Sequence, residues 1–185
     1  MTHSEFTPAT SAPSVSILSA IHRGVSASVP AESSIQILQT IGVESAEGVL
    51  KGFSAWRSDR SIGRGSVEDL SEGEFWSLLS EYLENQGWGS LSHEHLHPGI
   101  LSISSSDWEE GSERSASPGC HFAAGLFSEL LRLIAGQEVA VLEVECRSTG
   151  SGSCRFLVGS PAALETVYSN LRSGSAVRGA LEGLV

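Results

Sequence analysis

All three cysteines of the chain, Cys120, Cys146 and Cys154, fall in one stretch of its second half. Glu143 stands three residues before Cys146, so this stretch offers three thiols and a carboxylate. Zinc is usually held by four such groups in a tetrahedron. The short C-x-x-C spacing of many zinc sites is absent, so the spacing alone leaves two interpretations open: a metal site, or three small buried apolar residues.

A helix is expected to carry the first of these thiols. Apolar residues repeat at helical spacing between Ala123 and Ile134, and Gly136 follows them as a glycine typical of a helix C-terminus. A Pro-Gly pair breaks the chain before this pattern, which makes Ser117 the expected N-cap. Cys120 would then open the helix, where the helix dipole favours a thiolate.

A hairpin is expected to carry the other ligands. The segments 139–146 and 154–158 are rich in β-formers, and glycines between them supply a turn. Cys146 ends the first strand and Cys154 opens the second. In a flat strand Glu143 and Cys146 would face opposite sides, so both can reach one ion only if a bulge or sharp twist lies between them.

These motifs resemble the 4-vinyl reductase domain. The resemblance is carried by G-C-H-F at 119–122, E-V-E-C at 143–146 and G-S-G-S-C-R-F at 150–156. That family includes bacteriochlorophyll-biosynthesis proteins and the sensor domains of phenol- and xylene-responsive transcriptional activators. Its fold is similar to that of the TRAPP vesicle-tethering subunits. The general layout of the family extends over residues 30–170 of this chain.

The resemblance implies a zinc site. In the aromatic-responsive sensors of that family, three matching cysteines and the glutamate three positions before the second one hold a structural zinc ion. The corresponding ligands of Zn²⁺ here are Cys120, Glu143, Cys146 and Cys154. Four protein ligands leave no open position on the ion, so we expect it to be structural.

Three histidines, His93, His95 and His97, alternate along an expected strand and therefore face one side of it. Such a row can bind a metal, but no neighbouring carboxylate or thiol completes a site, which favours a half-exposed strand face. In the aromatic sensors, a histidine and a tryptophan from this part of the fold contact the bound phenol. The resemblance thus implies His95 with Trp88 or Trp108 as ligand-binding residues.

Composition limits the class of protein. The chain has 185 residues and a formal net charge of −11, which fits one domain that neither nucleic acid nor anionic membrane would attract. The N-terminus lacks the basic and apolar segments of a secretory signal, and no apolar run is long enough to span a membrane. An odd number of cysteines without a signal favours reduced thiols and a cytoplasmic location.

The order of elements predicts the fold. We expect a disordered tail at 1–14, a helix at 15–29 that serves in a homodimer, the zinc-containing domain at 30–174, and a C-terminal helix at 175–185. Within the domain, helices, a hairpin, a helix, a second hairpin and a helix follow one another. This order predicts an α+β fold in which helices pack on one face of an antiparallel sheet, as in the TRAPP-subunit-like fold that the resemblance implies.

Two further helix starts carry local signals. Ser71 with Glu74 three residues later matches a capping box. Ser160 before Pro161 matches an N-cap followed by a proline in the first turn.

Signals for catalysis are weak. The chain has no nucleophile elbow and no G-x-G-x-x-G unit. Glu109, Glu110 and Glu113 form an acidic cluster, which we interpret as a solvated loop and not as an acid–base pair. We therefore expect a zinc-stabilised, non-catalytic sensor or carrier that binds a small apolar or aromatic molecule. The alternatives are an accessory protein or reductase step in tetrapyrrole metabolism, and a scaffold subunit of a larger complex.

Overall fold

The computed structural model describes residues 17–60, 65–182 and 184. The expected tail at 1–14 and the first residues of the expected helix at 15–29 lie outside the described residues. Within them, no helix has the length and apolarity needed to cross a membrane. The helices are α1 (Ile17–Ser28), α2 (Ala31–Asp59), α3 (Glu72–Asn85), α4 (His121–Ala135), α5 (Pro161–Arg172) and α6 (Val177–Ala180). Short 3₁₀ turns are η1 (Val67–Asp69), η2 (Glu109–Gly111) and η3 (Arg147–Thr149).

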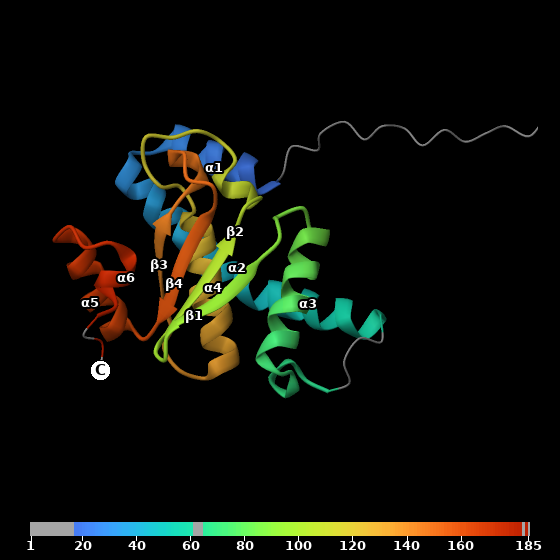
Figure 1. The fold of residues 1–185 in the computed structure, drawn as a ribbon. Helices are drawn as coiled ribbons and strands as arrows, with labels where there is room; N and C mark the ends of the chain where they lie inside the picture. The colour runs from blue at the N-terminus through green and yellow to red at the C-terminus, as the bar shows by residue number, and fades with distance from the viewer. Residues whose placement is uncertain (1–16, 61–64, 183, 185) are drawn as a thin grey trace, which may run out of the picture.

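The described strands are β1 (Ser92–His97), β2 (Ile100–Ser105), β3 (Ala140–Glu145) and β4 (Cys154–Gly159). They form one antiparallel sheet in the order β1-β2-β4-β3, so the two expected hairpins meet along β2 and β4. Figure 1 shows α2 and α4 crossing behind this sheet and α3 lying beside β1. The expected α+β class with an antiparallel sheet is confirmed.

Two glycines allow α2 and α4 to cross in close contact. A Cβ atom on Gly42 would lie 2.2 Å from the carbonyl oxygen of Phe122, and one on Gly125 would lie 2.1 Å from that of Gln39. No side chain fits in either place, so the two backbones touch only because both residues are glycine. Helix α2 continues without interruption through Gly42.

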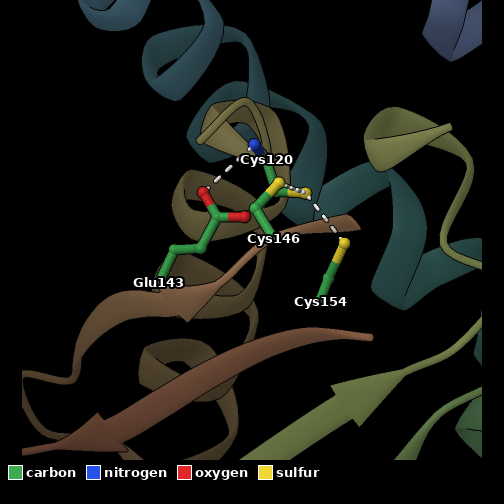
Figure 2. A group of neighbouring side chains, drawn as sticks. All are labelled: Cys120, Glu143, Cys146 and Cys154. Atoms are coloured by element: carbon green, nitrogen blue, oxygen red, sulfur yellow. Dashed lines mark hydrogen bonds between the residues drawn. The ribbon is translucent and has the colours of Figure 1, made fainter. Parts of the chain in front are cut away.

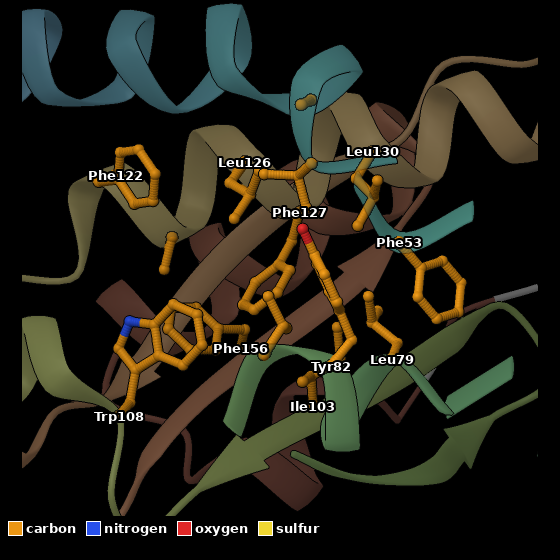
Figure 3. Close-up of a cluster of buried hydrophobic side chains, with 14 of the residues drawn as sticks. Phe53, Leu79, Tyr82, Ile103, Trp108, Phe122, Leu126, Phe127, Leu130 and Phe156 are labelled. Atoms are coloured by element: carbon orange, nitrogen blue, oxygen red, sulfur yellow. The ribbon is translucent and has the colours of Figure 1, made fainter. Parts of the chain in front are cut away.

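The main core lies between this helical layer and the sheet. Figure 3 shows its aromatic centre, where Phe127 of α4 packs edge-on against Phe156 of β4, with ring centroids 5.5 Å apart. Trp108, which follows β2, lies 5.4 Å from Phe127, and all three side chains are fully buried. Burying an aromatic or large aliphatic side chain of this kind contributes about 1.5–3 kcal/mol.

A second core lies on the opposite face of the sheet. Leu157 alternates with Phe156 along β4, so its side chain points away from the main core. There it packs with Ile100 of β2 and Leu164 of α5. The expected one-face arrangement therefore describes α2, α3 and α4, whereas α5 and α6 cover the other face. Figure 1 shows these two helices beside β3 and β4 and away from α3.

Local signals place most helix ends. Ser71 and Glu74 form both hydrogen bonds of the expected capping box at the start of α3. Gly136 adopts φ 67° at the end of α4, as expected for a C-terminal glycine. The expected N-cap at Ser117 is wrong, because α4 starts later and Cys120 takes the N-cap position.

Candidate metal centre

The structure brings the four expected metal ligands into one cluster (Figure 2). Cys120 lies at the start of α4, Glu143 in β3, Cys146 just after that strand, and Cys154 at the start of β4. One ligand atom from each residue lies within 4.8 Å of the others. The Sγ atom of Cys120 is 3.4 Å from that of Cys154 and 3.7 Å from that of Cys146. The cluster could hold a metal ion.

An irregularity in β3 turns Glu143 and Cys146 toward the same point. The register of β3 against β4 shifts between Glu143 and Glu145, which confirms the interruption expected there. The Oε2 atom of Glu143 accepts a hydrogen bond of 3.2 Å from the backbone N–H of Cys120. Its Oε1 atom is buried and has no hydrogen-bond partner among the residues that the structure describes.

The geometry of these donors fits a tetrahedral, thiolate-rich metal. With Zn–S bonds of about 2.3 Å, the sulfurs of a tetrahedral site lie about 3.8 Å apart. The separations that the Cys120 sulfur makes with its neighbours are close to this value. An unpartnered carboxylate oxygen in a buried place is costly, so Oε1 of Glu143 is accounted for if it is the fourth ligand.

Backbone and hydroxyl groups also point at the sulfurs. The N–H of Gly119 donates to Sγ of Cys146 at 3.4 Å, and the N–H of Arg147 donates to Sγ of Cys154 at 3.5 Å. The hydroxyl of Ser148 lies 3.0 Å from Sγ of Cys146. Donors placed in this way stabilise the thiolate forms that a metal requires.

Without a cation, the four groups cannot all carry charge. Hydrogen bonds from Cys120 and Cys154 lower the pKa of Cys146, and the bond with Cys146 in turn raises the pKa of Cys120. The bond with Cys120 lowers the pKa of Cys154, but the bond with Cys146 and burial raise it to about 12. Burial, followed by the proximity of Cys146, raises the pKa of Glu143 to about 8. A divalent cation would supply the charge that releases these protons.

The turn η2 closes the cluster. A Cβ atom on Gly111 would lie 2.5 Å from Sγ of Cys154 and 3.4 Å from Sγ of Cys120. All three cysteines are buried, with 1% or less of their surface exposed. A metal held here would have little access to solvent or to a substrate.

The interpretation of Glu109, Glu110 and Glu113 as a solvated loop is wrong for Glu110. Its side chain is buried, and its two carboxylate oxygens accept hydrogen bonds from the N–H groups of Phe122 and Ala123, at 2.7 and 2.9 Å. Burial raises the pKa of Glu110 to about 7. The sequence near residue 110 gives no signal for this contact, because both donors belong to α4.

The structure brings Trp88 and Trp108 together but places His95 elsewhere. The two indole rings meet edge to face, with centroids 6.4 Å apart. They flank the open end of the β1–β2 hairpin, whereas His95 pairs with Leu101 toward its turn. The Nε2 atom of His95 is 2.7 Å from Oε1 of Glu72 at the start of α3.

The other histidines of β1 have separate contacts. His93 stacks on Trp76 of α3, with ring centroids 5.4 Å apart. The strand register shifts after His95, and Nδ1 of His97 accepts a hydrogen bond of 3.2 Å from the N–H of Gly99. Over the described part of the chain, these histidines do not gather as a metal-binding group.

A groove with a volume of about 710 Å³ lies at the turn end of the sheet. His95 is one of its lining residues, and Leu101, Val139 and Val158 form part of its apolar wall. Small-molecule sites typically have volumes of roughly 300–1,000 Å³, mostly apolar walls and a few polar anchors. Trp88 and Trp108 do not line this groove.

Comparisons with known proteins found a family model and two solved structures that resemble this chain. The family model of the 4-vinyl reductase (V-4-R) domain matches residues 102–160, a span that holds all four residues of the cluster. The phenol-responsive sensory domain of the transcription activator PoxR, solved with phenol, aligns with a TM-score of 0.60 and 15% identity, over 88% of this chain and 82% of that chain. A vinyl-4-reductase family protein from Methanocaldococcus jannaschii aligns with a TM-score of 0.39 and 20% identity, over 83% of this chain and 98% of that chain. No curated protein matches the sequence.

Proposed function

We propose that this chain, a member of the 4-vinyl reductase domain family through residues 102–160, is a sensor or carrier domain that binds a small aromatic molecule and holds a structural zinc ion. The fold that it shares with a phenol-responsive sensory domain supports the first part of the proposal. The observation that carries it is the 710 Å³ groove, which combines apolar walls with the imidazole of His95.

The contact with Glu72 makes His95 a suitable hydrogen-bond acceptor for a ligand that carries a hydroxyl group. An ionised carboxylate only accepts hydrogen bonds, so the contact with Oε1 of Glu72 favours the ring tautomer that carries its proton on Nε2. The Nδ1 atom of His95 then remains an acceptor. A phenol could donate its O–H to this atom and place its ring against the apolar wall of the groove.

Calorimetric titration with phenol and with anisole tests this site. The two ligands share the ring, but anisole lacks the O–H donor. His95→Ala should weaken phenol binding by about 0.5–1.5 kcal/mol, the net range for a hydrogen bond to a partly exposed side chain, and should change anisole binding little. His93→Ala is the matched control, because His93 lies in the same strand but does not line the groove.

The titration can overturn the proposal at two levels. Equal phenol affinity in the wild type and in His95→Ala would remove His95 from the site. If neither ligand bound the wild type, the groove would not be an aromatic site. Native mass spectrometry of the freshly purified protein would then report whether it carries another small molecule.

The zinc part of the proposal rests on the closed cluster. Cys120, Glu143, Cys146 and Cys154 provide a full set of four ligands, and a site filled in this way serves structure and not catalysis. The ion would join the start of α4 to both strands of the β3–β4 hairpin. We therefore assign a binding role to the chain and no reaction.

We also propose that the domain acts as a cytoplasmic homodimer, without nucleic acid or membrane as a direct partner. The net charge of −11 supports the exclusion of polyanionic partners. Helix α1 is the proposed dimer element, because Ile17 leaves 77% of its surface exposed there.

A further inference from the structure

The backbone of Gly111 lies directly against the thiols. A methyl group in its place would come within 2.5 Å of Sγ of Cys154 and within 3.4 Å of Sγ of Cys120. The first distance is too short for any two such atoms, so an alanine here would displace the sulfur or the turn. Gly111 therefore sets how closely η2 can pack on the cluster.

The neighbouring side chain, Glu110, fixes the start of α4. The first N–H groups of a helix have no partner within it and are usually satisfied by the N-cap side chain. In α4 the N-cap is Cys120, and its side chain makes no capping bond within the described part of the chain. Glu110 takes over this task from η2, since its oxygens accept from the N–H groups of Phe122 and Ala123.

Because Glu110 satisfies these N–H groups, the side chain of Cys120 is not needed as a cap. A cysteine at the N-cap can turn its sulfur toward the cluster because another residue satisfies the helix N–H groups. The carboxylate of Glu110 joins η2 to α4 through these hydrogen bonds, and the missing side chain of Gly111 allows η2 to pack against the sulfurs. The backbone carbonyl of Trp108, at the other end of the turn, accepts a hydrogen bond of 2.9 Å from the guanidinium of Arg147, which directly follows Cys146.

We propose that Glu110 and Gly111 are positioning residues of the metal centre, which hold the Cys120 and Cys154 sulfurs in the geometry of a tetrahedral ion. This inference rests on the proposed metal centre. Neither residue is a ligand of the cluster, so both act through the ligands that they hold.

Glu110→Gln is the most informative variant. A glutamine keeps the size of the side chain, but its amide group presents N–H donors where the second oxygen accepted one. One backbone N–H of α4 then faces another donor, and the start of the helix must shift. Glu113→Gln is the matched control, because it removes the same charge from the same segment at an exposed position.

Metal affinity and coordination geometry can be measured directly with Co²⁺ and Zn²⁺. Binding of Co²⁺ to thiolates gives charge-transfer and d–d absorption bands that report tetrahedral geometry, and competition with a coloured chelator gives the zinc affinity. Loss of a residue that orients metal ligands typically weakens metal binding by about 10–100-fold. We expect this loss and altered Co²⁺ bands for Glu110→Gln, wild-type behaviour for Glu113→Gln, and partial recovery for Glu110→Asp.

The outcomes separate the inference from the proposal beneath it. A wild-type protein that binds neither metal would overturn the metal centre itself. A wild-type protein that binds Co²⁺ through thiolates, together with unchanged affinity and bands in Glu110→Gln, would overturn only the positioning role. If Glu110→Gln did not fold, Gly111→Ala would carry the test, because it leaves the hydrogen bonds of Glu110 in place. Wild-type affinity and bands in that variant would count against the inference equally.

Discussion

The Sγ atoms of Cys120 and Cys154 lie 3.4 Å apart, although the two residues are 34 positions apart in the chain. One belongs to the helical layer and the other to the sheet. An ion bound between them would therefore fasten the two layers together, in addition to the main core that packs between them.

Removal of the proposed zinc should cost much of the stability of the fold. Apparent zinc free energies in small thiolate sites are about 10–16 kcal/mol at neutral pH, whereas whole domains are stable by only about 5–15 kcal/mol. We expect about one zinc per chain by elemental analysis, a large fall in melting temperature in strong chelator, and insoluble or loosely folded Cys146→Ser. Below about pH 5, protons should displace the metal from the thiolates.

Glu143→Gln is the matched comparison for the cysteine variant. A carboxamide oxygen or a water can replace the carboxylate, so this change should lower the melting temperature less than Cys146→Ser does. Freshly purified protein without zinc, whose melt does not change in chelator, would falsify the site.

Stability of the metal-free protein should depend on pH with a definite sign. Burial raises the pKa of Glu110 from an ordinary 4.5 to about 7. Between these values the folded state keeps a proton that the unfolded state has lost, so the free energy of unfolding should fall as the pH rises from about 4.5 to 7. The shift corresponds to about 3 kcal/mol. Glu143 and Cys146 together carry one negative charge in this pH range, on Cys146 in the folded state and on Glu143 in the unfolded state. Because the number of protons on the pair is the same in both states, it adds little to the pH dependence.

Denaturant unfolding of the metal-free protein at pH 5 and pH 7.5 measures this slope. Glu110→Gln should flatten it, because the amide does not titrate. The metal-loaded protein should show the opposite slope, since metal binding strengthens as the thiols lose their protons. A metal-free wild type that gained stability over this range would show that Glu110 is ionised in the folded state.

The parts of the fold that could be predicted from the sequence are those with local signals. Ser71 and Ser160 cap helices as expected, because a capping side chain bonds to backbone groups only two or three residues away. The irregularity in β3 was predictable because strand parity places Glu143 and Cys146 on opposite faces. The resemblance then identified the cluster that the structure assembles.

The remaining features depend on contacts between distant segments. Glu110 looks like its solvated neighbours in sequence, and only the position of the α4 N-terminus, 12 residues later, makes it a buried cap. His95 and Trp88 lie near one another in sequence, but the hairpin register places them toward opposite ends of β1. The resemblance that implied both as ligand-binding residues carries no information on the register of the hairpin.

Self-association through α1 can be tested without disturbing the fold. One side of α1 is held on its own chain, where the hydroxyl of Ser19 donates to Oε1 of Glu109 at 2.8 Å. The opposite, exposed side carries Ile17, Ala20 and Gly24, a narrow stripe that would let a second helix approach closely. We expect a dimer by light scattering at high micromolar concentration.

Gly24→Arg should convert this dimer to a monomer. No atom of the described residues lies within 4 Å of the place that a Cβ would take on Gly24, so the arginine fits this part of the chain and would block a partner. Deletion of residues 1–28 should also give a monomer, but it removes Leu18 from the main core, so Gly24→Arg is the cleaner test. A wild type that is already monomeric, or a Gly24→Arg variant that remains dimeric, would exclude this face.

The contact between α2 and α4 predicts opposite effects for two glycines. Gly125→Ala adds a methyl group 2.1 Å from the carbonyl oxygen of Gln39, and neither backbone can give way without moving its helix. Overpacking of this kind costs about 1–3 kcal/mol, so thermal and denaturant unfolding should show a loss of that size or more. Gly48→Ala is the matched control within α2, because its Cβ would meet no atom within 4 Å over residues 17–60 and 65–182. Alanine is the better helix former by about 1 kcal/mol, so that variant should be as stable as the wild type or slightly more so. Equal stability of both variants would mean that the helices do not cross at Gly125 as closely as the structure shows.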